Sequence, residues 1–252
     1  MSSLTLRRTK VEDLSPIKGL ALRELDLTGT QVADLTPLRG MKLQRLVLSS
    51  NKVITNLSPL VNMPIAHLEL EYCDSLKDIS PLSTLPLRNL TLYHSPVSDL
   101  SALSGLSLEK LNVGMTRITQ LEPLRGIPLV DLRVEYTGVG DILPLKGMPL
   151  KVLMLNGTKV LDLSPLRGMQ LTHAYLRRTR VADLSALQGM PLMAVWLPDV
   201  AVTNGMEYLR RIPQLRYITT PDTTLWDAER FWTKYDEGNF PWKREAESSP
   251  RD

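Results

Sequence analysis

The chain has 252 residues, 43% of them hydrophobic and 23% charged, and this composition excludes an intrinsically disordered protein. Basic residues number 30 and acidic residues 27, and this balance argues against nucleic acid or an anionic membrane as the main partner. The single cysteine, Cys73, excludes an internal disulfide and a multi-cysteine zinc site, and it fits a reducing compartment.

The N-terminal segment "MSSLTLRRTK" lacks the apolar run of a secretory signal peptide, and no segment approaches the roughly 20 apolar residues that span a bilayer. We therefore expect a cytoplasmic protein without a membrane partner. The first expected strand, Leu4 to Leu6, begins almost at the first residue, so no preceding segment covers its edge. This predicts self-association at the uncapped N-terminal edge, or an upstream domain that covers it.

From Ala21 onward the sequence repeats the unit "PLxxLxLxxTxVxDLSPLxGM" with a period of 21 or 22 residues. Such a period, with leucines in the pattern LxxLxL, is typical of a leucine-rich repeat solenoid. The alternating leucines, such as Leu153 and Leu155, should point inward from one short strand in each repeat. We therefore predict an α/β fold, a right-handed solenoid over residues 1–220, in which about ten coils each add one parallel strand.

After each strand a small polar residue recurs, and in repeats of this kind it hydrogen-bonds the turn backbone from a buried position. The expected ladder consists of Thr30, Asn51, Thr116, Thr137, Thr158 and Thr179. The nonapeptide "LDLSPLRGM" at 161–169 then forms the convex wall, a single helical or 3₁₀ turn. Asp162 and Ser164 offer capping oxygens, Pro165 suits the first turn, and Gly168 ends it.

The repetitive string "TxVxDLSPLxGM" resembles the leucine-rich repeats of bacterial internalins over about residues 4–212. The "GMPL" linkage and the tail "ERFWTKYDEGNF" resemble the intracellular repeat arrays of planctomycete-type bacteria, which are often attached to serine/threonine protein kinases. The second resemblance implies that the chain is the regulatory or sensor region of such a kinase, because no kinase motif occurs in it.

Toward the C-terminus the repeat pattern degrades. Residues 225–235, "LWDAERFWTKY", predict an amphipathic helix with Leu225, Ala228, Phe231 and Trp232 on one face. We expect residues 221–236 to form a C-terminal capping helix and residues 237–252 a flexible polar tail, in which Phe240 and Pro241 dock first.

Candidates for chemistry are few. The three histidines, His67, His94 and His173, fall in different repeats at different strand positions, which argues against a metal site. Cys73 replaces a ladder residue and is expected to be a buried structural thiol. The "GVG" at 138–140 lacks the strand and helix of a nucleotide-binding fingerprint. We therefore predict no enzyme activity, no cofactor and no metal.

The concave face of the predicted sheet is the best candidate site, because its outward positions carry Tyr, Trp, Arg and Met, which dominate protein interfaces. An ordinary solvated sheet face is the alternative. The predicted partner-binding residues are Glu69, Glu71, Tyr72, Tyr93, His94, Arg133, Glu135, Tyr136, Tyr175, Arg177 and Trp196.

On the convex side, the variable place in "PLxGM" holds Lys18, Arg39, Arg125, Lys146 and Arg167. We expect these side chains to be solvated charges that keep the array soluble, with phosphates or an acidic protein as alternative partners.

The sequence thus favours a non-catalytic interaction module that binds a protein or peptide on its concave face. The kinase-regulatory region is the second hypothesis. No residue set supports a third, a free-standing hydrolase or transferase.

Overall fold

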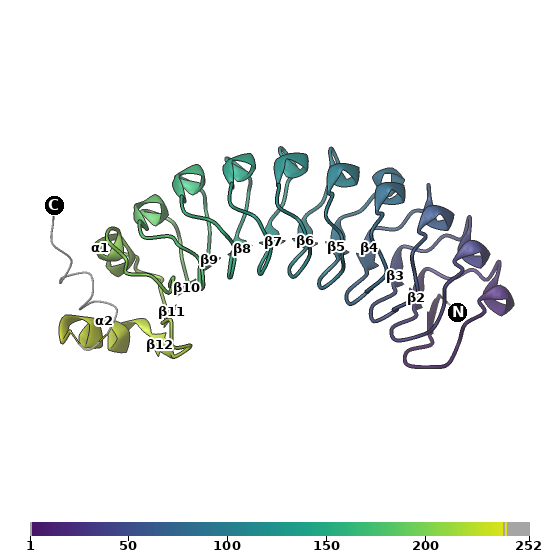
Figure 1. Ribbon diagram of the computed structural model, residues 1–252, viewed down its shortest axis with the longest axis horizontal. Helices are drawn as coiled ribbons and strands as arrows, with labels where there is room; N and C mark the ends of the chain where they lie inside the picture. The colour runs from purple at the N-terminus through teal and green to yellow at the C-terminus, as the bar shows by residue number, and fades with distance from the viewer. Residues whose placement is uncertain (1, 239, 241–252) are drawn as a thin grey trace. The chain divides into compact units, whose positions relative to one another are not determined.

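The computed structural model describes residues 2–238 and 240, and the chain divides into two compact units, Met1–Leu129 and Val130–Asp252. In both units short strands alternate along the chain with single turns of 3₁₀ helix, as Figure 1 shows. The elements of the first unit, here called unit 1, are β1 (Ser3–Thr5), η1 (Ser15–Ile17), β2 (Glu24–Asp26), η2 (Thr36–Leu38), β3 (Arg45–Val47), η3 (Ser58–Leu60), β4 (His67–Glu69), η4 (Ser80–Thr84), β5 (Asn89–Thr91), η5 (Ser101–Leu103), β6 (Lys110–Asn112) and η6 (Glu122–Leu124).

The second unit, unit 2, continues the alternation and then departs from it. Its last convex element is an α-helix, and two strands and a longer helix follow it. The elements are β7 (Asp131–Arg133), η7 (Leu143–Leu145), β8 (Val152–Met154), η8 (Ser164–Leu166), β9 (His173–Tyr175), η9 (Ser185–Leu187), β10 (Ala194–Trp196), α1 (Met206–Arg210), β11 (Tyr217–Thr219), β12 (Leu225–Asp227) and α2 (Ala228–Asp236).

The strands of unit 1 pair in parallel, in chain order from β1 to β6, in a register that places equivalent residues side by side. The middle residue of each strand is therefore stacked on its counterpart: Leu4, Leu25, Leu46, Leu68, Leu90 and Leu111. From Leu25 onward these leucines are at most 2% exposed. The row confirms the predicted parallel solenoid, in which each coil covers the leucines of the next.

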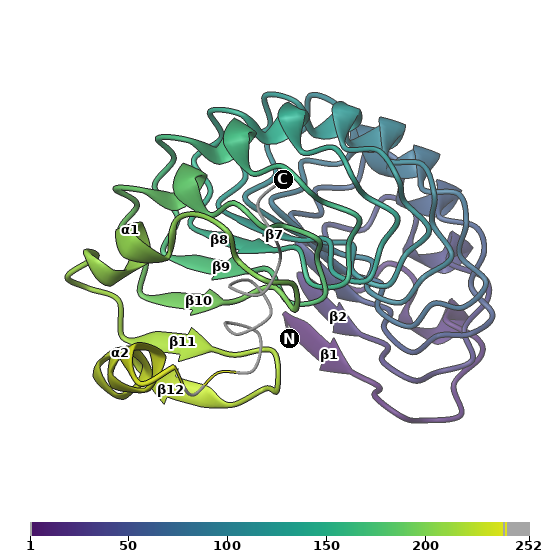
Figure 2. The same ribbon diagram turned by 60° about the vertical axis from the view of Figure 1, so that its left-hand side comes forward.

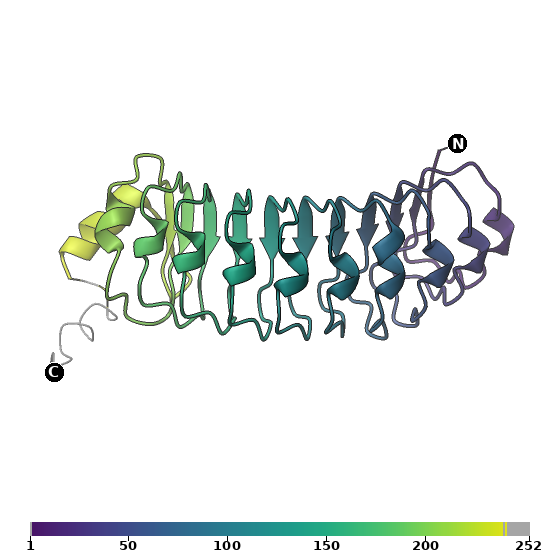
Figure 3. The same cartoon turned by 90° about the horizontal axis from the view of Figure 1, so that it is seen from above.

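In unit 2 the same pairing runs from β7 to β11, and β12 then pairs antiparallel with β11. Figure 2 shows β10, β11 and β12 side by side with α2 next to them. The middle positions again form one buried row: Leu132, Leu153, Ala174, Val195 and Ile218. Seen from above, the 3₁₀ turns of each unit lie in a row in front of its strands (Figure 3).

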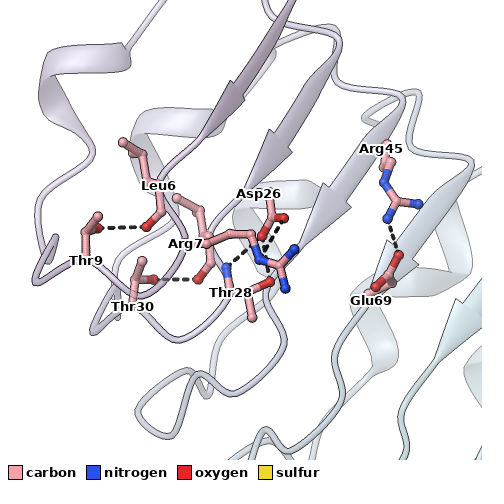
Figure 4. Close-up of polar contacts among 9 residues, drawn as sticks. Leu6, Arg7, Thr9, Asp26, Thr28, Thr30, Arg45 and Glu69 are labelled. Atoms are coloured by element: carbon pink, nitrogen blue, oxygen red, sulfur yellow. Dashed lines mark hydrogen bonds and ion pairs between the residues drawn. The ribbon is translucent and has the colours of Figure 1, made fainter.

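The predicted polar ladder is confirmed. The Thr158 hydroxyl donates to the carbonyl of Leu155 at 2.6 Å, and Thr30, Thr116, Thr137 and Thr179 make the equivalent bond three residues back. Figure 4 shows this bond for Thr9 and Thr30. Asn51 instead links two coils, because its Nδ2 donates to the carbonyl of Val32 in the preceding coil at 2.7 Å. These bonds satisfy buried carbonyl groups at the turn after each strand.

The convex turn follows the predicted chemistry with one correction. Asp162 Oδ1 accepts from the Ser164 backbone N–H at 2.7 Å, and Gly168 leaves the turn with a φ of 79°. Ser164 does not cap the backbone, because its hydroxyl donates to Asp162 Oδ2 at 2.6 Å. These bonds lower the pKa of Asp162, and Asp13, Asp34, Asp99 and Asp183 have pKa values lowered in the same way.

The first strand and the last helix have different bounds from those predicted. Strand β1 covers residues 3–5 rather than Leu4 to Leu6. The predicted capping helix over 221–236 begins seven residues later, and the amphipathic segment from Leu225 three residues later, since Leu225–Asp227 form β12 and only Ala228–Asp236 are helical. The reason is Asp227, whose side chain accepts the Arg230 N–H at 3.0 Å as the helix N-cap while its own backbone stays extended. Leu225 is consequently 62% exposed instead of lying on the apolar face of the helix.

Helix α2 is held by Phe231, which is fully buried and packs on Trp232, Tyr235 and Phe240 with ring centroids 4.8–5.9 Å apart. Apart from Glu237, Gly238 and Phe240, the predicted tail over 237–252 lies outside the described residues. No helix among the described residues has the length and apolar character to cross a membrane.

Candidate functional site

The outward face of the strands is built by simple alternation. In each strand from β7 to β10 the middle residue is buried in the core, so the first and third residues, and the second residue after the strand, face outward. Within unit 2 the register aligns the third positions of neighbouring strands. We call the outward side chains of β7 to β10, and those that follow these strands, the unit 2 face.

An aromatic pair lies on the last two strands of the unit 2 face. Tyr175 and Trp196 pair directly across β9 and β10, and their rings meet edge to face with centroids 4.9 Å apart. His173 stacks on Tyr175 at 6.5 Å from the first position of the same strand. Partial burial raises the pKa of the Tyr175 phenol. The two rings form a half-buried apolar surface of the kind that anchors protein interfaces.

Charged groups flank this aromatic pair. Arg133 Nε and Nη2 donate to both oxygens of Asp131 at 3.1 and 3.0 Å, and this pairing raises the pKa of the Arg133 guanidinium. Glu135 is different, because burial raises the pKa of its carboxyl and its Oε2 has no hydrogen-bond partner among the described residues. Arg177 Nε is also buried without a hydrogen bond there, and it lies 3.9 Å from the carboxylate of Asp199.

Tyr136 reaches across one coil of the unit 2 face because the next coil has a glycine at the equivalent position. A Cβ on Gly157 would lie 2.5 Å from Cδ1 of Tyr136, so the ring covers this glycine. The guanidinium of Arg178, in the coil after that, lies 5.9 Å from the centroid of the same ring. The glycine thus lets an aromatic ring and a cation two coils apart come together.

In unit 1 the predicted acidic residues are already paired. Glu69 of β4 forms an ion pair with Arg45 of the neighbouring strand β3 (Figure 4). Glu71 accepts the hydroxyl of Thr91 at 2.9 Å. Both carboxylates therefore bind side chains of neighbouring coils. The repeat alignment indicates only that these residues occupy equivalent strand positions, and it does not predict the partners.

The aromatic residues of unit 1 form a second, smaller cluster. Tyr72 meets Tyr93 edge to face at 5.6 Å, and His94 lies 5.1 Å from the Tyr72 ring. The Tyr93 hydroxyl donates to the sulfur of Met115 at 2.9 Å, and His94 Nδ1 lies 3.9 Å from Asp74. These contacts join rings from neighbouring coils into one patch.

A shared backbone conformation unites several of these residues. Tyr72, His94, Met115, Tyr136 and Arg178 all have positive φ values of 54–56°. In the alignment of repeats they occupy the position that Gly29 and Gly157 fill in other coils. We call these equivalent positions the positive-φ column. Glycine alternates with larger residues along it, and this alternation is visible in the sequence. The column includes Met115 and Arg178, which are absent from the list of predicted partner-binding residues.

The predicted residues thus divide between the units. Glu69, Glu71, Tyr72, Tyr93 and His94 belong to unit 1, and Arg133, Glu135, Tyr136, Tyr175, Arg177 and Trp196 belong to unit 2. The prediction missed Asp131, Met154, Asn156 and Asp199, which lie on or beside the unit 2 face.

The groups considered for catalysis show no catalytic arrangement. Cys73 is buried and its Sγ donates to the carbonyl of Leu48 at 3.4 Å. Burial raises the pKa of its thiol to about 12, which makes it a poor nucleophile. In the described part of the chain no three His, Cys, Asp or Glu residues come together as metal ligands.

Comparison with known proteins places the fold. No family model and no curated protein matches the chain. Among solved structures, internalin C2 from Listeria monocytogenes matches with 29% sequence identity and a TM-score of 0.64, over 71% of this chain and 79% of its own.

Two further internalins of Listeria monocytogenes share the fold at 20% identity. Internalin F has a TM-score of 0.68 and matches 84% of this chain and 71% of its own, and the functional domain of internalin J has a TM-score of 0.59 and matches 87% and 53%. The internalin J domain includes a cysteine ladder. In this chain a single cysteine, Cys73, occupies a ladder position.

Proposed function

We propose that this chain, an internalin-like leucine-rich repeat protein, is a non-catalytic module that binds a protein or peptide on the unit 2 face. The observation that carries the proposal is the pairing of an aromatic surface, Tyr175 and Trp196, with two buried polar atoms that lack hydrogen bonds in the described structure, Glu135 Oε2 and Arg177 Nε. Rigid aromatic surface anchors protein interfaces, and the two buried polar atoms gain hydrogen bonds when their side chains turn toward a ligand.

The polar atoms indicate what the partner must supply. An unsatisfied buried polar group costs about 1–3 kcal/mol, and a ligand that hydrogen-bonds it recovers part of that cost. Glu135 needs a donor and Arg177 an acceptor. A peptide carries both in its backbone N–H and C=O groups, and its side chains can cover Tyr175 and Trp196. A protein segment therefore fits this face better than an ion or a purely apolar molecule.

A displayed library of random peptides tests the proposal. The native chain is the bait, and the enriched peptides are then measured for affinity against a variant with Tyr136, Tyr175, Arg177 and Trp196 changed to Ala. We expect the variant to lose at least about 2 kcal/mol of binding free energy, roughly thirty-fold in Kd.

The matched control changes four exposed unit 2 residues outside the face, Lys146, Lys159, Leu161 and Arg167, to Ala. Circular dichroism confirms that each variant is folded. Peptides that bind the native chain and the face variant equally would refute the unit 2 face as the binding site, as would a control variant that loses binding to the same extent.

Two earlier hypotheses stay predictions. No contact among the described residues bears on a kinase-regulatory role or on location in the cytoplasm. Self-association at the N-terminal edge, where Leu4 is only partly buried in β1, is likewise a prediction.

A further inference from the structure

A groove in unit 1 lies away from the strand face. It is formed by the two loops that follow η1 and η2, and its volume is about 480 Å³. Its floor is apolar, since Leu22 and Met41 are nearly buried and Leu20 is 48% exposed. Gly19 and Gly40 leave the loops open, because a Cβ on either would meet no atom within 4 Å. The volume lies in the range of small-molecule sites.

The groove carries positive charge only. Lys18, Arg23, Arg39 and Lys42 line it, and no acidic residue does. All four side chains are exposed. Within residues 2–238 and 240, none of them forms an ion pair, whereas Arg7, Arg45 and Arg88 of the same unit all pair with carboxylates.

The repeat scaffold does not require these charges. One coil later the positions equivalent to Arg39 and Lys42 hold Val61 and Pro64, and the backbone makes the same turn there. Arg125, at the same position of a later coil, is bound by Glu122 at 2.6 Å. Lys146 and Arg167, at this position in two later coils, also form no ion pair within the described residues. The first two coils gather four such cations around one groove, and their like charges repel one another until an anion neutralises them.

We propose that this groove binds a small molecule that carries two or more phosphoryl groups. Four cations line a groove of about 480 Å³, so a compact ligand with several negative charges would neutralise them best. A phosphate ester carries about −1.5 to −2 charges in one compact group, whereas a peptide spreads one carboxylate per residue over about 3.3 Å of chain. Arg23 and Arg39 offer planar forks that match phosphate oxygens, and Lys18 and Lys42 add mobile donors.

The test uses inorganic tripolyphosphate and isothermal titration calorimetry on the full chain at about 0.1 M salt, where screening still permits short-range contacts. The variant Arg39→Gln with Lys42→Gln removes two cations from the groove. The control Lys146→Gln with Arg167→Gln removes the same net charge from the convex turns of unit 2.

We expect the groove variant to lose at least ten-fold in affinity and the control to lose less than two-fold, and we expect monophosphate to bind far more weakly than tripolyphosphate. Equal losses in both variants would mean that net charge alone attracts the anion and would overturn the proposal. A glutamate-rich peptide of the same charge that binds more tightly than tripolyphosphate would overturn it too.

A second experiment, with lipid vesicles, distinguishes a lipid headgroup from a soluble molecule as the source of the phosphoryl groups. Vesicles that contain phosphatidylinositol bisphosphate are sedimented with the native chain and the groove variant. Co-sedimentation lost in the variant assigns the phosphoryl groups to a lipid headgroup, and binding of tripolyphosphate without co-sedimentation assigns them to a soluble ligand. Absence of binding in both arms would overturn the proposal.

Discussion

Gly157→Ala tests how the unit 2 face is assembled. Gly157 has a φ of 67°, and a Cβ there would lie 2.5 Å from Cδ1 of Tyr136. The positive φ costs an alanine about 1 kcal/mol. The clash also displaces the Tyr136 ring and its contact with Arg178, which adds about 1–2 kcal/mol. We therefore expect unfolding free energy to fall by about 2–3 kcal/mol.

Gly29→Ala is the matched control, because Gly29 has a φ of 68° but its nearest neighbour, Arg8 Cγ, would lie at 3.4 Å from the new Cβ. It should cost only the backbone strain of about 1 kcal/mol. In a Tyr136→Ala background, Gly157→Ala should cost the same small amount, since no ring remains to displace.

The assay is urea-induced unfolding followed by circular dichroism. Tryptophan fluorescence reports on unit 2 separately, because all four tryptophans of the sequence lie after residue 130. Equal costs for Gly157→Ala and Gly29→Ala, or a Gly157→Ala cost that does not change when Tyr136 is removed, would refute the claim that the ring lies on this glycine.

Three further predictions concern the scaffold. The pKa values of Asp34 and Asp162 are lowered from 3.8 by the hydroxyl and then the backbone N–H of Thr36 and Ser164, so their stabilising effect is present above about pH 4 and is lost as the pH falls through the lowered values. Changing both to Asn, the residue that Asn56 already provides at this position, should lower the urea midpoint at pH 7 and leave it unchanged near pH 2, and a difference that persists at low pH would contradict this assignment. Cys73, with a thiol pKa of about 12, should react with a thiol reagent at pH 8 only after unfolding, and rapid labelling of the folded chain would contradict its burial. Phe231→Ala should cost about 3–5 kcal/mol of unfolding free energy in unit 2, measured by tryptophan fluorescence, because the ring is fully buried, and a loss below about 1 kcal/mol would show that α2 is not packed through this residue.

The coils were predictable from the sequence because each one contacts mainly its neighbours, so a fixed period specifies the fold. Leu153 and Leu155 are buried, and Thr158 makes its ladder bond, as their places in the repeat predict. The C-terminal end was only partly predictable. There Asp227 interrupts an apolar pattern that is compatible with both a strand and a helix, and pairing with β11 decides in favour of β12.

The candidate site was predictable as a set of positions and not as a set of contacts. The period identified Arg133, Tyr175 and Trp196 as outward-facing, and the pairing of their strands confirms that geometry. The period did not predict that Arg133 would hydrogen-bond to Asp131, or that Arg177 Nε would have no hydrogen bond in the described structure. Those outcomes depend on side-chain conformations across neighbouring coils, which a repeat pattern does not specify.

The column of positive-φ residues explains how the face varies while the coils stay constant. Three residues of the column donate their backbone N–H to a carbonyl of the following coil: Tyr72 to Tyr93 at 2.8 Å, His94 to Gly114 at 3.0 Å and Tyr136 to Asn156 at 2.7 Å. The Arg178 N–H donates instead to Oδ1 of Asp199, at 3.3 Å. Backbone bonds therefore hold the left-handed conformation whatever the side chain is, and they offset a strain of about 1 kcal/mol per residue. Glycine is needed in this column chiefly where a neighbouring ring must lie over the backbone, as at Gly157. Large exposed side chains and glycines can thus be exchanged along the column with little effect on the coils, which changes the shape of the outward face and preserves the core beneath it.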